Sequence, residues 1–284
     1  MCGLAGLILG KKRRRADERE YLTWLFTRIL VASENLGPHA TGVAWLNNLG
    51  EHALFKRPVR ASQLVVDKAF HEMISSVDNR TTLLMGHTRW RTRGDERNNL
   101  NNHPLLGSGI VLTHNGTVVN ADELFKRYRL KRRAEVDSEV LVRLAGRAAA
   151  KDGGVDIEAL RRLLRPCRGQ MSGVLACRRD PETILLLKGN KPLELRWNRK
   201  RRTIFYASEG SYLDAILMED PGWRTVDLAP MSLAVMDCGD LTHLTIAPLE
   251  FITQGRSTQK GLETVTNSMK TTGNSPQNPR GSTQ

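Results

Sequence analysis

Short apolar runs separated by turn-forming residues dominate the first half of the chain. Residues 3–9 are apolar throughout, which is typical of a buried strand. Residues 17–33 have helical spacing, and a glycine and a proline at Leu36-Gly37-Pro38 end that pattern. The apolar face of this helix consists of Tyr21, Leu22, Leu25, Ile29 and Leu30.

The remaining pattern alternates strands with helices. We expect strands near residues 41–46, 52–56, 83–87, 109–113, 173–178, 184–188, 193–196, 203–207, 233–237 and 241–246. We expect helices near residues 122–128, 137–150, 157–164 and 212–218. Several strands are joined by hairpin-length turns, which favours antiparallel pairing. The pattern therefore predicts an α+β fold with two antiparallel sheets and helices outside them.

The composition changes from about Gln254 onwards. Thr, Ser, Asn, Gln, Gly and Pro dominate there, and no aromatic residue follows Phe251. Such a segment cannot bury enough apolar surface to offset its chain entropy. We therefore expect one domain at residues 1–252 and a polar, disordered tail at residues 253–284.

Charge and cysteine content restrict the function classes. The net charge is +13, and basic residues cluster at 11–15, 126–133 and 196–202. Such a surface attracts polyanions, so nucleic acid is a candidate partner, although a solvated basic face is the plain alternative. The four cysteines form no CxxC pair, so we expect no metal site, no disulfide framework and no cofactor.

The location of the protein is predicted from absent signals. No stretch approaches the roughly 20 apolar residues that a membrane-spanning helix needs. The apolar start precedes the first basic cluster, which is the wrong order for a signal peptide. We expect a cytoplasmic protein, in the host cytoplasm if the chain is phage-encoded.

Cys2 is the first candidate for chemistry. If Met1 is removed, Cys2 carries both a thiol and a free α-amine, and this amine titrates near pH ~8 and can act as base for the thiol. The alternative is a small apolar residue ahead of a buried strand.

Three further motifs each have a functional and a plain interpretation. Residues 86–94 (GHTRWRTRG) place Arg89 after a strand, where its side chain could bind a carboxylate and Trp90 could line a pocket. The plain alternative is a basic surface loop. Asn115 and Gly116 offer two donors of an oxyanion hole, or a common Asn-Gly turn. Asp137 could face a substrate ammonium, cap a helix, or do both.

Together these motifs resemble the class II glutamine amidotransferase domains, which are N-terminal-nucleophile hydrolases. The glutaminase domains of glucosamine-phosphate synthase and amidophosphoribosyltransferase are similar. The matching segments are 1–6 (MCGLAG), 86–92 (GHTRWRT), 102–104 (NHP), 114–116 (HNG) and 137–139 (DSE), with weaker matches at 191–193 (KPL) and 207–209 (ASE). The resemblance covers roughly residues 2–210 and implies a four-layer αββα sandwich.

The resemblance also implies roles for individual residues. Cys2 would attack the glutamine side-chain amide, and Asn115 with Gly116 would hold the oxyanion. The substrate pocket would use Arg89 for the α-carboxylate and Asp137 for the α-amino group. It would be lined by Trp90 and Thr92. A γ-glutamyl thioester on Cys2 would release ammonia, and water would then release glutamate.

One segment departs from the family pattern. Residues 36–42 read LGPHATG, with Leu36 and His39 where the family usually has Arg and Asp. Since that Arg supports the nucleophile region in the family, these changes bear on rate and pocket geometry. Arg93 also stands where the synthase often has His.

Four functions remain open from the sequence. The first is a standalone glutaminase that supplies ammonia to a separate partner enzyme, in nucleotide or nucleic-acid modification. The second is a catalytically impaired binding or regulatory protein with the same fold. The third is an amidase acting on another amide, and the fourth is a basic nucleic-acid-binding protein without chemistry.

Overall fold

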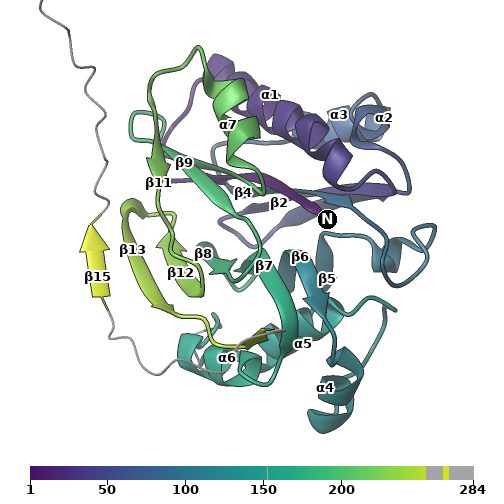
Figure 1. The fold of residues 1–284 in the computed structure, drawn as a ribbon. Helices are drawn as coiled ribbons and strands as arrows, with labels where there is room; N and C mark the ends of the chain where they lie inside the picture. Colours follow the sequence, from purple (N-terminus) through teal and green to yellow (C-terminus); the bar gives the residue numbers. More distant parts are fainter. Residues whose placement is uncertain (152, 254–264, 269–284) are drawn as a thin grey trace, which may run out of the picture.

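Two stacked β-sheets with helices on their outer faces make up the molecule (Figure 1). The computed structural model describes residues 1–151 and 153–253, together with the backbone of residues 265–268. Within these ranges no helix is both long and apolar enough to cross a membrane.

The first sheet contains seven antiparallel strands, counted over the described residues. Their order is β11 (Trp223–Val226), β9 (Glu194–Asn198), β10 (Thr203–Ala207), β1 (Gly3–Leu9), β4 (Thr81–Arg89), β2 (Ala40–Asn47) and β3 (His52–Arg57). The register pairs Gly3 of β1 with Thr88 of β4. Continuing this register by one residue sets Cys2 opposite Arg89.

The second sheet faces the first. In the part of the chain that the structure describes, its order is β15 (Val265–Ser268), β13 (Asp240–Pro248), β12 (Ser232–Asp237), β8 (Asp180–Lys188), β7 (Arg168–Cys177), β6 (Ile110–Val118) and β5 (Leu105–Gly107). The short strand β14 (Ile252–Thr253) pairs parallel with β7. All other pairs in this sheet are antiparallel.

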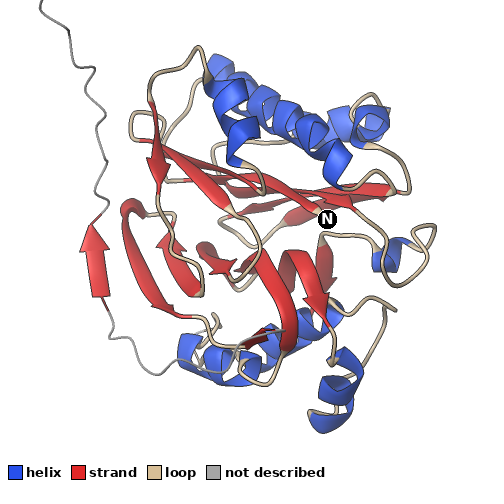
Figure 2. Cartoon of the chain, in the orientation of Figure 1, coloured by secondary structure: helices blue, strands red, loops and turns tan. Residues whose placement is uncertain are grey.

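Helices cover both outer faces (Figure 2). The first sheet is covered by α1 (Ala16–Ala32), α2 (Ala61–Leu64), α3 (Lys68–Ser75) and α7 (Gly210–Leu217), and the second by α4 (Ala121–Arg127), α5 (Glu139–Arg147) and α6 (Ile157–Leu164). Short 3-10 turns, η1 (Ser33–Leu36) and η2 (Asn99–Asn101), follow α1 and precede β5. In α1, Asp17 and Glu18 occupy the first turn, where a negative charge complements the helix dipole.

Three apolar layers hold the four structural layers together. Leu4 and Ile8 of β1 pack between the sheets, whereas Ala5, Leu7 and Leu9 pack under α1. A third cluster joins the second sheet to α4, α5 and α6. Because both faces of β1 are buried, its sequence reads as a continuous apolar run rather than an alternating one. The predicted αββα architecture of two antiparallel sheets is confirmed.

The observed elements differ from the prediction in several places. The strand expected at 109–113 continues to Val118, because β7 pairs with it along its whole length. The helix expected at 137–150 is shorter and spans Glu139–Arg147. Helices α2 and α3 lie in a region where no element was predicted, although Asp67 caps α3 by accepting the N–H of Ala69 at 2.8 Å.

The predicted tail at residues 253–284 falls mainly outside the described residues. Thr253 ends β14, and the backbone of Val265–Ser268 pairs with β13. The disorder of the tail therefore stays a prediction.

Candidate active site

Cys2 lies at one end of the space between the sheets. Successive side chains of a strand point to opposite faces, so Cys2 shares the face of Leu4 and Ile8, which pack between the sheets. Figure 1 shows the N-terminus at the end of the first sheet, on the side of the second. The Sγ atom of Cys2 accepts the N–H of Trp90 at 3.4 Å and lies 3.7 Å from the Trp90 carbonyl oxygen.

The start of β1 is held by contacts that only small residues permit. A Cβ atom on Gly3 would lie 2.4 Å from Oγ1 of Thr88, so no other residue fits beside the nucleophile without a shift. The N–H of Leu4 donates to Oγ of Ser208 at 2.9 Å, and the N–H of Ser208 donates to the carbonyl of Leu4 at 3.0 Å. The motifs around Gly3 and Ser208 thus position Cys2.

Arg89 is the last residue of β4 and is only 3% exposed. Its Nη1 donates to Oδ1 of Asn102 at 2.8 Å, and its Nη2 donates to the carbonyls of Arg93 at 2.5 Å and Gly94 at 2.8 Å. The interpretation of this motif as a surface loop is therefore wrong for Arg89. Three of its five N–H donors are engaged, which leaves two for another acceptor.

The loop after Arg89 is exposed. Trp90 is 46% exposed and borders Cys2, while Arg93 forms an ion pair with Asp122 at 3.1 Å. Thr92 is exposed, and its hydroxyl makes no hydrogen bond to any other residue within the described ranges. The structure thus brings Trp90 to the nucleophile but does not bring Thr92 into contact with it.

Asn115 lies on β6, on the same side as Val111, which packs between the sheets. Its side-chain Nδ2 is buried and has no hydrogen-bond partner among the described residues. An unpaired buried donor is costly, so it marks a position where an acceptor is expected. The Asn-Gly turn interpretation is wrong, because Asn115 and Gly116 pair with Ser172 and Met171 inside the β6–β7 ladder.

Gly116 adopts a backbone conformation that favours glycine. Its φ is +145°, and a Cβ atom there would lie 2.1 Å from the carbonyl oxygen of Gln170. The backbone of β6 at Gly116 consequently lies closer to β7 than a side chain at this position would permit.

Asp137 does not cap α5. The N-cap is Ser138, whereas Oδ2 of Asp137 accepts the N–H of Val118 at 2.5 Å. The helix-cap interpretation is wrong, because the carboxylate turns to the end of β6 instead. Asp137 is 6% exposed, and one hydrogen bond leaves most of its acceptor capacity unused.

Opposite charges act on the thiol of Cys2. Burial has the largest effect and raises the pKa of Cys2, and the carboxylate of Asp137 raises it further. The Trp90 hydrogen bond, the N-terminal ammonium and the Arg89 guanidinium lower the pKa, but the net change is upward. The thiol is therefore protonated at neutral pH and needs a base before it can attack.

Three buried histidines stack beside these groups. The rings of His87 and His103 lie 4.2 Å apart between centroids, and His114 lies 6.5 Å from His103. Nε2 of His87 donates to the carbonyl of His114 at 3.1 Å, which bridges β4 and β6. Burial lowers the pKa of all three, that of His87 to about 3. The motifs contain these histidines, but nothing in their spacing predicted the stack.

His39 contacts the site through the backbone. Its Nδ1 accepts the N–H of Arg91 at 3.0 Å, and its own N–H donates to the carbonyl of Arg89 at 3.1 Å. Its ring packs edge-on against Trp90, with 5.1 Å between centroids. Leu36 is the other residue that departs from the family pattern. It is partly buried and ends η1. His39 thus supports the segment that borders Cys2.

The site contains one cysteine thiol, on Cys2. Among the described residues, no group of three or more His, Cys, Asp or Glu side chains could hold a metal ion. The fold and site together define the class: an αββα sandwich with a cysteine next to the N-terminus, at the open end between its sheets, is an N-terminal-nucleophile hydrolase fold.

Comparisons with known proteins agree with this class. A family model described as a glutamine amidotransferase domain matches residues 87–215. A 7-cyano-7-deazaguanine synthase from Saccharolobus solfataricus is 28% identical over 222 residues, which are 76% of this chain and 44% of the relative. A glutamine–fructose-6-phosphate aminotransferase from Photorhabdus laumondii is 30% identical over 199 residues, 68% of this chain and 29% of the relative.

The solved structure of glutamine phosphoribosylpyrophosphate amidotransferase from B. subtilis has the same fold. Its TM-score is 0.64 at 18% identity, over 88% of this chain and 49% of that one. The chain therefore contains a class II glutamine amidotransferase domain, and relatives with this domain are enzymes. It spans less than half the length of the curated relatives described above.

Proposed function

We propose that this protein is a glutaminase that uses Cys2 as an N-terminal nucleophile and supplies ammonia to a partner enzyme. The observation that carries the proposal is the position of the thiol: Cys2 lies beside Trp90, under the influence of Arg89 and Asp137. A cation and a carboxylate near one thiol suit free glutamine, which is a zwitterion at neutral pH.

Binding uses the donors and acceptors that the protein leaves unpaired. A remaining N–H group of Arg89 holds the α-carboxylate, in an orientation fixed by Asn102 and two backbone carbonyls. Asp137 holds the α-ammonium with the oxygen that Val118 does not use. This arrangement directs the side-chain amide of glutamine towards Cys2.

The reaction begins after Met1 is removed. The Cys2 amine takes the thiol proton as Sγ bonds to the amide carbon, and the resulting oxyanion accepts hydrogen bonds from Nδ2 of Asn115 and the N–H of Gly116. The ammonium of Cys2 then protonates the leaving nitrogen, and ammonia departs as the thioester forms. Water cleaves the thioester to glutamate and restores the thiol.

The relatives suggest the kind of acceptor. Several relatives are named 7-cyano-7-deazaguanine synthase, and this chain matches 44% to 48% of the length of three of them. We infer that the ammonia acceptor acts on a modified purine base, in nucleotide or nucleic-acid modification. Glutamine labelled with ¹⁵N at its amide should then label the product of such a partner only when this protein is present.

A second candidate function rests on Leu36 and His39. If these changes had abolished the chemistry, the chain would be a binding or regulatory protein that retains the fold. The buried, unpaired Nδ2 of Asn115 argues for a working site, because such a donor is costly unless an acceptor uses it.

Labelling with 6-diazo-5-oxo-norleucine, a glutamine analogue that alkylates nucleophilic thiols, tests the proposal. We expect intact mass to show loss of Met1 and one adduct, mapped to Cys2 and suppressed by L-glutamine but not by D-glutamine. Cys167, Cys177 and Cys238 are buried, so the folded protein offers one accessible thiol. Cys2→Ala should keep the fold and lose both adduct and ammonia release. A processed protein without an adduct would favour the binding function.

A further inference from the structure

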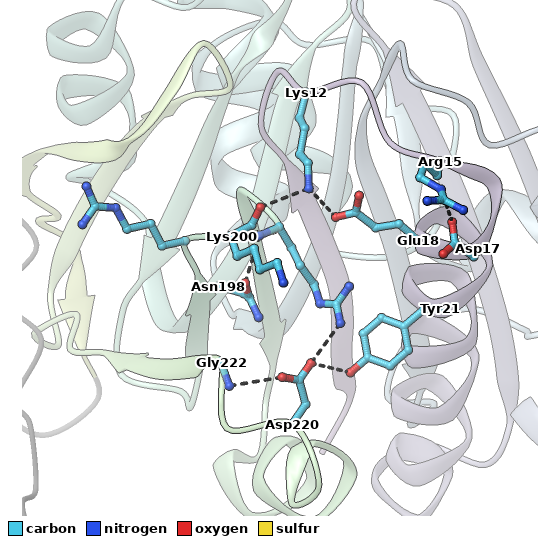
Figure 3. Close-up of a pocket in the computed structure, with 11 residues that line it drawn as sticks. Lys12, Arg15, Asp17, Glu18, Tyr21, Asn198, Lys200, Asp220 and Gly222 are labelled. Atoms are coloured by element: carbon cyan, nitrogen blue, oxygen red, sulfur yellow. Dashed lines mark hydrogen bonds and ion pairs between the residues drawn. The ribbon is translucent and has the colours of Figure 1, made fainter.

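Two basic segments far apart in sequence meet around one cleft. The β1–α1 loop supplies Lys12 and Arg15, and the β9–β10 turn supplies Arg199, Lys200 and Arg201. The cleft has a volume of about 1010 Å³, and α1 and the segment before β11 complete its walls (Figure 3). It lies at the far end of β1 from Cys2, and the seven residues of β1 span about 20 Å.

The two basic segments are held together by a buried charge. Arg14 is only 3% exposed, and its Nη2 donates to the carbonyls of Gly10, Arg201 and Arg202 at 2.9–3.1 Å. Lys12 adds a second link, since its Nζ donates to the carbonyl of Lys200 at 3.0 Å (Figure 3). The cationic side chains around the cleft are consequently presented by a fixed backbone.

Part of the positive charge around the cleft is neutralised internally. The lining carries five basic and three acidic side chains. Three ion pairs use up the acids, namely Lys12–Glu18 at 2.6 Å, Arg15–Asp17 at 3.4 Å and Arg201–Asp220 at 3.4 Å.

Two cations of the cleft lining remain without an acidic partner. Arg199 and Lys200 in the turn are exposed and form no ion pair with any described residue. Like charges held close together repel one another and attract counterions. Binding of a polyanion, which releases these counterions, is therefore favoured.

Aromatic rings extend from the cleft along α1. The Arg201 guanidinium lies 4.3 Å from the centre of the Tyr21 ring, and Tyr21 stacks on Trp24 at 6.0 Å. Trp24 is 49% exposed, with Arg28 lying 5.5 Å from its ring centre. Exposed rings beside unpaired cations are typical of surfaces that bind single-stranded nucleic acid, whose bases stack on the rings.

We propose that this cleft binds a single strand of nucleic acid. The phosphates contact the two unpaired cations Arg199 and Lys200, and a base stacks on Trp24. An acidic protein would match the charge but would offer no base to stack on the exposed part of the Trp24 ring. Because the cleft and Cys2 lie at opposite ends of β1, a bound strand leaves the nucleophile accessible. The proposal stands independently of the glutaminase function.

Fluorescence anisotropy with a labelled single-stranded oligonucleotide of about 20 nucleotides tests the proposal, at about 50 and about 200 mM salt. We expect the double variant Arg199→Glu, Lys200→Glu to weaken binding at least about tenfold. The number of ions released on binding, obtained from the salt dependence of the affinity, should fall by about two. Trp24→Ala should weaken binding at least about fivefold, with a smaller change in salt dependence.

The matched control makes the same charge change on another basic cluster. Lys126 and Lys131 are exposed and have no acidic partner among the described residues, so Lys126→Glu, Lys131→Glu should bind almost as tightly as the wild type. Equal losses in both double variants would mean diffuse attraction and overturn the proposal. So would binding of poly-glutamate with no binding of the oligonucleotide, which would assign the cleft to an acidic protein. Thermal unfolding of each variant shows that the fold is retained.

Discussion

At the scale of single residues, the site depends on groups whose hydrogen-bonding capacity is only partly used. Arg89 and Asp137 each make the bonds that orient them and keep others free, while Nδ2 of Asn115 has no partner in the described structure. Such groups are expensive to bury unless a ligand completes them. Arg89, Asp137 and Asn115 share this free capacity, although His103 and Thr113 also hold buried polar atoms without a partner among the described residues.

Replacement of Arg89 by Lys tests this reasoning. Lysine keeps the charge but cannot reach Asn102, two carbonyls and a substrate carboxylate together. We expect the KM for glutamine to rise about 10- to 100-fold, since each hydrogen bond to a charged group contributes about 1.5–3 kcal/mol. The change in kcat should be smaller. Steady-state ammonia release measures both constants.

The control for Arg89→Lys is the same change at Arg91. Arg91 is exposed and pairs with Glu96 at 2.9 Å, so Arg91→Lys should leave KM within about twofold, as expected for a surface ion pair. A normal KM in Arg89→Lys would show that the guanidinium has only a structural role.

Sequence identified the residue types of the site better than their contacts. Cys2, Arg89, Asn115 and Asp137 were predicted as candidates, and the structure places the first two beside Trp90 and faces Asn115 into the same space. Their catalytic roles stay predictions. The carboxylate of Asp137 reaches Val118 rather than a helix end, because that contact joins positions 19 residues apart.

At the scale of elements, the segment between η1 and β2 is the one that departs from the family pattern. Gly37 passes so close to β4 that a Cβ atom would lie 2.3 Å from the carbonyl of Thr88. His39 then supports Trp90 and Arg91 through one accepted hydrogen bond and a ring contact. We infer that His39 supports this segment at the position where the family usually has Asp.

Removal of the acceptor at position 39 should loosen this segment. His39→Ala leaves the N–H of Arg91 unpaired, and a single hydrogen bond is worth about 0.5–1.5 kcal/mol. We expect kcat/KM and the rate of Cys2 alkylation by 6-diazo-5-oxo-norleucine to fall about two- to tenfold.

His39→Asp is the matching rescue variant, because aspartate again offers an acceptor to Arg91. It should recover most of the activity that His39→Ala loses. An alanine variant as fast as the wild type would mean that the contacts of Arg89 alone hold the segment.

Elements were predictable where the apolar pattern was long and strong. The strand at 3–9 and helix α1 match the expectation closely, whereas α2 and α3 were missed. Helix α2 has four residues, too few for a helical period to stand out, whereas α3 has eight, as many as the correctly predicted helix α6. Asp67 was the available signal for α3, as an N-cap ahead of Phe70 and Met73.

At the scale of the whole molecule, the packing of the two sheets encloses titratable groups that a sequence pattern cannot show. β4 and β6 were predicted as separate strands, but only their placement across the sheet interface brings His87, His103 and His114 together. Of these, His103 makes no hydrogen bond through either ring nitrogen within the described structure. Proton binding to this stack is therefore disfavoured in the folded protein.

This stack makes the fold sensitive to mild acid. An unfolded histidine titrates near pH ~6.5, whereas burial lowers the pKa of His87 to about 3 and those of His103 and His114 in the same direction. Below about pH 6.5 the unfolded chain thus binds protons that the native protein does not. We expect the free energy of unfolding to fall on acidification by up to about 1.4 kcal/mol per pH unit for each histidine.

Urea denaturation between pH 7 and pH 5 measures this slope, above the range in which most carboxylates titrate. His103→Gln should lower overall stability but reduce the slope by about one proton, because one buried titratable ring is gone. His71→Gln is the control: His71 is exposed, so its removal should leave the slope unchanged. A slope that His103→Gln does not alter would mean that the stack is protonated in the native protein, and that the sheet interface admits charge without opening.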